Sequence, residues 1–150
     1  MLLLVSTGLS GCSGTRSYCS SLGEDKVRLN RLAADAGKAG TAGADALGET
    51  VGVLADLRDQ APDDISDEWV TLVGALEGLV DAFRASGATP GDFAGGSKPE
   101  GVTRGQYDAV QQAVAELRST RVQQAGKSIE QHGLDVCKVD LRSGLGGVGG

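Results

Sequence analysis

The stretch that decides the fold runs from Pro62 to Ala85 and reads PDDISDEWVTLVGALEGLVDAFRA. Its apolar residues recur every three or four positions, so at 100° per residue they fall on one arc, as in an amphipathic helix. The residues on this arc are Ile65, Trp69, Leu72, Val73, Leu76, Leu79, Val80 and Phe83. We therefore predict a helix over 62–85 around which the rest of the chain packs.

Both ends of this helix carry local signals. Pro62 suits a helix entry, and Asp63 or Asp64 can cap the first turn. Ser86-Gly87 marks the exit, because glycine readily adopts the backbone conformation that ends a helix. These signals make 62–85 the most clearly bounded element of the sequence.

Four further segments repeat the helical spacing, and no segment alternates apolar and polar residues as a strand does. The expected helices cover 17–36, 44–60, 103–119 and 120–137. The sequence therefore predicts an all-α fold, a small up-down helical bundle of four to five helices stapled by one disulfide. The bundle spans 17–138, and 139–150 is expected to be a disordered Gly-rich tail.

Composition limits the partners. The chain has 150 residues, a formal charge of −6 and 24 glycines, well above the usual share of about 7%. An acidic domain of this kind argues against binding to nucleic acid and against electrostatic attraction to anionic lipid. We expect one domain with a single core.

The first residues resemble an export signal. Residues 1–11 form a short apolar run with small residues at its end, too short to cross a bilayer. Leu9-Ser10-Gly11-Cys12 resembles a bacterial lipobox, in which the cysteine becomes the lipid-carrying first residue of the mature protein. The basic start of a signal is missing, which suggests a translation start upstream of Met1. An ordinary signal peptide with an incidental cysteine is the alternative.

This interpretation makes 12–16 a lipidated Cys and tether and places the protein on the outer face of the cytoplasmic membrane. The chain has three cysteines, so lipid on Cys12 leaves Cys19 and Cys137 as an even pair in an oxidising setting. We predict a disulfide between them, joining the first helix to the last. Two free buried thiols are the alternative.

One polar residue lies in line with the apolar stripe of the first helix. Asp25 shares a face with Tyr18 and Leu22, and a buried carboxylate needs a hydrogen-bonding or basic partner. Tyr18 and Trp69 are candidate partners, so these residues form a possible buried polar or ligand site. Alternatively, Asp25 lies at the edge of the stripe and reaches water.

The loop over 86–101 reads SGATPGDFAGGSKPEG, which is long for a small domain. Such loops are either functional or mobile, and Phe93 can pin this one to the bundle. With no clustered polar groups in it, we expect a mobile crossover.

No catalytic or metal-binding pattern is visible. His132 is the only histidine, and no metal-ligating residue lies four positions away on its helix. The acidic residues over 63–68 lack the spacing of a calcium loop and suit a helix start. The GxGxxG match over 144–149 neither follows a strand nor opens a helix, so it is not a dinucleotide site. We expect no metal, no cofactor and no enzymatic activity.

The chain resembles a group of small secreted lipoproteins of unknown function from high-GC Gram-positive bacteria. The resemblance rests on Cys12, on Tyr18-Cys19, on APDDISDEW over 61–69, on LEGL over 76–79, and on IEQH followed by DVCK over 129–138. It implies export and agrees with the disulfide, but it implies no activity.

We expect a non-enzymatic binding or interaction module of the cell envelope, held to the membrane through lipid on Cys12. Its partner is an envelope protein or a small ligand. The alternative function is a small-ligand carrier or transport accessory with a pocket between helices near Asp25 and Trp69.

Overall fold

A computed structural model describes residues 12–36 and 40–141 of the chain. Within these residues the chain forms five α-helices, two shorter helical turns and no strand. They are α1 (Cys12–Ala36), α2 (Thr41–Gln60), α3 (Ser66–Ser86), the 3-10 helix η1 (Pro90–Phe93), α4 (Arg104–Leu117), α5 (Thr120–His132) and the π-helix η2 (Gly133–Cys137). The predicted all-α bundle is confirmed.

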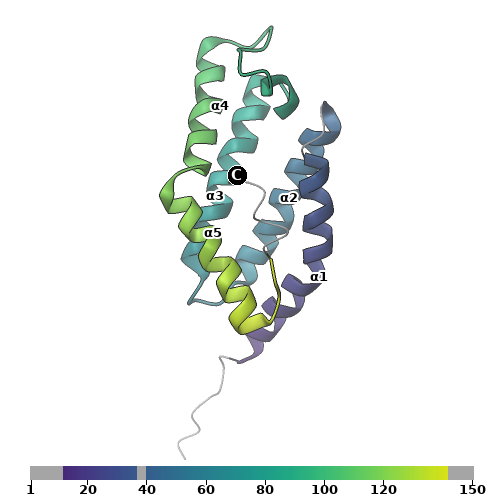
Figure 1. The fold of residues 1–150 in the computed structure, drawn as a ribbon, viewed down its shortest axis with the longest axis vertical. Helices are drawn as coiled ribbons and strands as arrows, with labels where there is room; N and C mark the ends of the chain where they lie inside the picture. The colour runs from purple at the N-terminus through teal and green to yellow at the C-terminus, as the bar shows by residue number, and fades with distance from the viewer. Residues whose placement is uncertain (1–11, 37–39, 142–150) are drawn as a thin grey trace, which may run out of the picture.

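The helices form an up-and-down bundle in which α3 is the central member (Figure 1). α1 packs on α2, α2 packs on α3, and both α4 and α5 pack on α3. α4 and α5 follow one another back along α3, so together they occupy the place of a fourth helix. After α5, η2 packs on α1.

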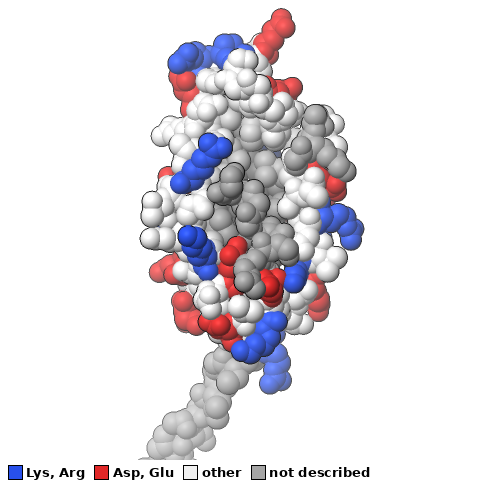
Figure 2. Space-filling model, in the orientation of Figure 1, with Lys and Arg blue, Asp and Glu red and all other residues white. Residues whose placement is uncertain are grey.

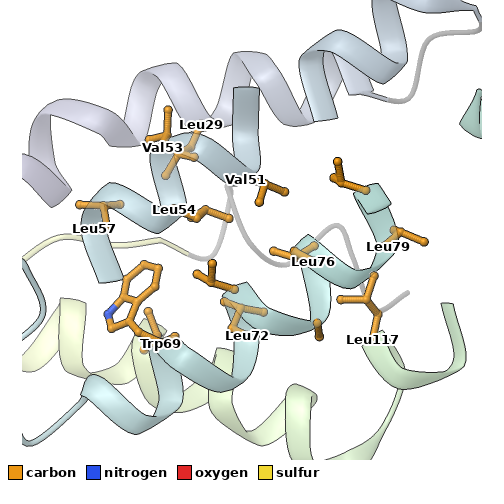
Figure 3. Close-up of a cluster of buried hydrophobic side chains, with 14 of the residues drawn as sticks. Leu29, Val51, Val53, Leu54, Leu57, Trp69, Leu72, Leu76, Leu79 and Leu117 are labelled. Carbon is orange, nitrogen blue, oxygen red and sulfur yellow. The ribbon is translucent and has the colours of Figure 1, made fainter. Parts of the chain in front are cut away.

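The predicted apolar arc of α3 is its buried face. All eight arc residues are buried, whereas Gly74 and Gly78 on the opposite face are exposed. Figure 3 shows Leu54 and Leu57 of α2 facing Trp69 and Leu72 of α3. Each fully buried side chain of this size contributes about 1.5–3 kcal/mol through the hydrophobic effect. The central position of α3 therefore follows from the width of its apolar face.

The start of α3 differs from the prediction. The helix begins at Ser66, because 62–65 form a turn in which the Ile65 amide donates to the Pro62 carbonyl. Ile65 is the N-cap and provides no capping side chain, so neither Asp63 nor Asp64 caps the helix. At the other end Gly87 has φ 68° and donates to the Phe83 and Arg84 carbonyls, which confirms the predicted exit.

The first helix also starts earlier than expected. α1 begins at Cys12 rather than at about residue 17, so the segment expected to be a tether over 12–16 is helical. α2 likewise begins at Thr41, three residues before the expected start. The proposed signal over 1–11 lies outside the described residues.

The break between α4 and α5 lies where a serine caps the second helix. The Ser119 hydroxyl accepts a hydrogen bond from the Val122 amide, and the Thr103 hydroxyl caps α4 by accepting from the Gln106 amide. Both are standard N-cap bonds, in which a side-chain oxygen takes up an otherwise unpaired helix donor. Thr103, the first residue of the segment expected to be helical over 103–119, is thus the N-cap of α4.

The end of the last helix departs from α-helical spacing. The helix was expected to continue through residue 137, but 133–137 form the π-helix η2, and Val136 is 47% exposed. A π turn carries more residues than an α turn, so it shifts side chains away from the α-helical stripe.

Residues 139–141, expected to open a disordered tail, pack on the bundle instead. Leu141 is 2% exposed, and the Val139 amide donates to the Gly133 carbonyl. The remainder of the predicted tail, 142–150, lies outside the described residues.

The connection between α3 and α4, expected to be a mobile crossover, contains η1 and is attached to both helices through ring contacts. Phe93 packs edge-on against Phe83 of α3 and is stacked on Tyr107 of α4, with ring centroids 5.4 Å and 5.9 Å apart. The Tyr107 hydroxyl donates to the Gly96 carbonyl at 3.1 Å. The predicted pinning role of Phe93 therefore holds.

No helix in the described part of the chain is both long and apolar enough to cross a membrane.

Candidate functional site

The predicted disulfide joins the two ends of the described chain. Cys19 on α1 is bonded to Cys137 of η2, with their Cα atoms 5.0 Å apart and a sequence separation of 118. Besides packing on α2, α1 contacts η2, and the disulfide makes this contact covalent. The pairing leaves Cys12 as the only cysteine of the sequence outside the bond.

Next to the disulfide lies a buried pair of aromatic side chains with polar groups. The indole Nε1 of Trp69 donates a hydrogen bond of 2.9 Å to the Tyr18 hydroxyl, and both residues are 0% exposed. Their rings meet edge to face, with centroids 6.3 Å apart. The structure thus brings together two of the three residues predicted as a polar site, α1 supplying one and α3 the other.

The third predicted residue, Asp25, lies outside this pair. It is half-buried rather than buried, and the Trp69 donor is satisfied by Tyr18. The structure therefore matches the alternative in which the carboxylate lies at the edge of the stripe. Sequence spacing placed Asp25 and Tyr18 on one helix face but could not tell which of them Trp69 contacts.

Sequence reasoning missed one member of the cluster. The His132 ring packs on the Tyr18 ring, with centroids 5.8 Å apart, and its side chain is only 9% exposed. Its Nε2 lies 3.5 Å from a carboxylate oxygen of Asp64, which is exposed in the turn before α3. Neither ring nitrogen has a hydrogen-bond partner among the described residues. The one signal in the sequence was the position of His132 on the same stripe as Ile129.

Burial raises the pKa of Tyr18 above its ordinary value of 10.0. The hydrogen bond from Trp69 acts in the opposite direction, and the negative charge of Asp64 raises the pKa further. Tyr18 is therefore a neutral phenol at physiological pH and not a ready base. Within the described residues no serine or cysteine forms a hydrogen bond with His132, so this cluster lacks a nucleophile and base pair.

The acidic residues that precede and open α3 point outward. Asp63, Asp64 and Asp67 are exposed, and Glu68 is half-buried. In the described parts of the chain, no group of three His, Cys, Asp or Glu residues is arranged to hold a metal ion. The described acidic residues at this end of the bundle are therefore exposed to solvent and are not grouped to coordinate a metal ion.

A cavity lies at the opposite end of the bundle. It has a volume of about 420 Å³ and opens between the first turns of α2 and the last turns of α3, next to the start of η1. Its lining consists of Ala44, Asp45, Leu47, Gly48, Val80, Phe83, Arg84, Gly87, Ala88 and Pro90. We call it the distal cavity. No pattern in the sequence predicts this cavity, because three separate segments have to meet to form its wall.

Few large apolar side chains are exposed on the described surface, and two of them lie in η2. The exposed ones are Val27, Val70, Leu134 and Val136. Figure 2 shows basic and acidic side chains interspersed on one face of the bundle. A few exposed apolar residues are normal on soluble surfaces and do not define a docking patch.

Comparisons of the chain with protein-family models, with curated proteins and with solved structures found no match.

Proposed function

We propose that this chain is an exported lipoprotein of the cell envelope, anchored through lipid on Cys12 and acting as a non-enzymatic binding module. The observation that carries the proposal is the Cys19–Cys137 bond. Structural disulfides persist mainly in oxidising compartments outside the cytoplasm. The bond takes up two of the three cysteines, and the third stands in the lipobox-like stretch.

The helical start of the chain agrees with this proposal. α1 begins at Cys12 and continues for 25 residues, which at 1.5 Å per residue is about 37 Å. A lipid on Cys12 would therefore hold the disulfide end of the bundle near the membrane and present the distal end outward. The resemblance to small secreted lipoproteins of high-GC Gram-positive bacteria supports the same compartment.

Binding rather than catalysis is favoured by the arrangement of reactive side chains. The buried cluster holds a neutral tyrosine, an indole and one histidine; the indole donates to the tyrosine hydroxyl, and the His132 Nε2 lies 3.5 Å from Asp64. A second candidate function, a small-ligand carrier, is favoured by the distal cavity. It differs from the sequence-based alternative in location, because the surroundings of Trp69 are packed and its donor is satisfied.

The anchoring proposal is tested by replacing the proposed lipid acceptor. Cells grown with a clickable fatty acid should label the wild-type protein and not a Cys12→Ala variant. The variant should leave the membrane fraction. Ser13→Ala, changed at the next position, is the matched control and should keep both label and location. Lipid labelling that persists in Cys12→Ala would end the proposal.

A further inference from the structure

We propose that the distal cavity is a binding site for a small, uncharged and largely apolar molecule with an aromatic ring or a branched aliphatic group. This inference rests on the binding-module function and gives that function a site and a ligand class. The cavity volume of about 420 Å³ lies within the range of about 300–1,000 Å³ that is usual for small-molecule sites.

The inner wall of the cavity is apolar. Val80 and Phe83 of α3 and Leu47 of α2 contribute aliphatic and aromatic surface, and all three also belong to or pack on the core. Since the floor is continuous with the core, a ligand there would exchange water for contacts with fixed side chains. An apolar group gains about 25 cal/mol for each Å² of surface so buried.

The outer wall is held in place before any ligand arrives. Ala88 and Pro90 belong to the loop that Phe93 fixes between Phe83 and Tyr107. The Gln106 side chain of α4 also donates to the Ala85 carbonyl at 2.7 Å, joining the start of α4 to the end of α3. A site that is already formed does not lose conformational entropy on binding, which favours affinity for a small molecule.

Charge at the rim selects against a strongly charged ligand. Asp45 and Arg84 both line the opening, so the rim carries one charge of each sign. Arg84 is 3.4 Å from Asp81, and both side chains are about three-quarters exposed, so the pair is worth at most about 1 kcal/mol. A charged ligand of either sign would therefore meet one like charge at the rim. An uncharged ligand does not depend on an opposite charge there.

Gly48, which lines the cavity, is a suitable position for a substitution that tests the proposal. Gly48 lies inside α2, where glycine costs about 1 kcal/mol relative to alanine. A Cβ built on it meets nothing within 4 Å among the described atoms, so close helix packing does not require a glycine there. Gly52, one turn further along α2, is equally open but does not line the cavity.

The experiment is a fluorescence titration of the purified protein with N-phenylnaphthylamine, an uncharged aromatic probe. The wild-type protein should bind the probe saturably at one site. Gly48→Leu should weaken binding by about ten-fold or more, because the added side chain occupies space at the cavity. Gly52→Leu, the matched control, should bind as the wild type does. Both variants should keep or raise the melting temperature, since each replaces a helical glycine.

Two results would overturn the proposal. One is the absence of saturable binding by the folded wild-type protein, and the other is equal binding by the two leucine variants. Cys12→Ala should bind the probe as the wild type does, because the cavity lies at the far end of the bundle. Failure of the anchoring proposal and failure of the ligand-binding proposal therefore give different results, the first in lipid labelling and the second in probe binding.

Discussion

The Tyr18 hydroxyl is the acceptor for the only indole donor in the chain. Replacing Tyr18 with phenylalanine removes the hydroxyl but leaves the rings in place, so the Trp69 Nε1–H stays buried without its partner. Leaving such a donor unsatisfied costs about 1–3 kcal/mol. We expect Tyr18→Phe to lower the free energy of unfolding by this amount in urea titrations. A midpoint equal to that of the wild type would show that the bond contributes nothing.

The same residue predicts a response to alkaline pH. Because burial raises the pKa of Tyr18 in the folded state, the unfolded chain loses this proton first as pH rises above about 10. The folded state is therefore penalised from the unfolded pKa upward, and stability falls with pH until the folded pKa is passed. Urea midpoints measured at about pH 9 and about pH 11 should fall more for the wild type than for Tyr18→Phe. Equal losses would contradict the assignment.

Gly133 shows why one glycine is required where others are not. A Cβ at this position would lie 3.2 Å from the Val139 carbonyl oxygen and 3.2 Å from a Leu141 methyl carbon. Gly133→Ala should therefore destabilise the fold by about 1–3 kcal/mol through overpacking. Gly126→Ala on α5, where a Cβ meets nothing within 4 Å among the described atoms, should stabilise it by about 0.5–1 kcal/mol. Thermal melts of the two variants should shift in opposite directions.

At the scale of elements, α4 and α5 together occupy the place of one helix in the bundle, and the capped start of α5 divides them. α4 ends at Leu117, and α5 restarts when the Ser119 hydroxyl accepts from the Val122 amide. The break lets both pieces bury apolar side chains against α3, Val110 and Leu117 from α4 and Ile129 from α5. A capping serine therefore serves tertiary packing as well as the local start of a helix.

Ser119→Ala removes that cap, and we expect it to cost about 1 kcal/mol, within the usual range of about 0.5–2 kcal/mol. Ser128→Ala is the matched control, because Ser128 is exposed in the middle of α5 and alanine is the better helix former. Thermal unfolding followed by circular dichroism should separate the two variants. An unchanged melting temperature for Ser119→Ala would mean that the cap bond is not needed.

At the scale of the whole molecule, the disulfide closes a bundle whose first helix packs mainly on the second. Its loop of more than 100 residues restricts the unfolded chain, which in the entropy model is worth about 4–5 kcal/mol. Replacing both Cys19 and Cys137 by serine should lower the unfolding free energy by about this amount in guanidinium titrations. Reduction of the wild-type protein should have the same effect. A midpoint unchanged by reduction would contradict this role.

Local pattern was sufficient for the helices and their best-marked ends. The arc of α3 follows from repeated spacing between near neighbours, and the Thr103 cap and the Gly87 exit depend on a few adjacent residues. Two helix ends were misplaced, the start of α3 and the end of α5. The 62–65 turn is closed by a local bond from the Ile65 amide to the Pro62 carbonyl, which the entry signal at Pro62 does not distinguish from a first helical turn. The π-helix η2 contacts α1 and is bonded to it through Cys137, and spacing along the chain does not encode such distant contacts.

The sequence by itself determined the all-α class and the buried face of α3, because the apolar period is a property of the chain. The cysteine pairing followed from the sequence only once Cys12 was set aside as the expected lipid acceptor. Tertiary structure alone decided that His132 packs on Tyr18, that Leu141 enters the core and that a cavity forms beside Gly48. Each of these needs segments that are distant in sequence to meet. Which distant surfaces meet is set by the packing of the whole core, since a buried side chain contacts many neighbours at once.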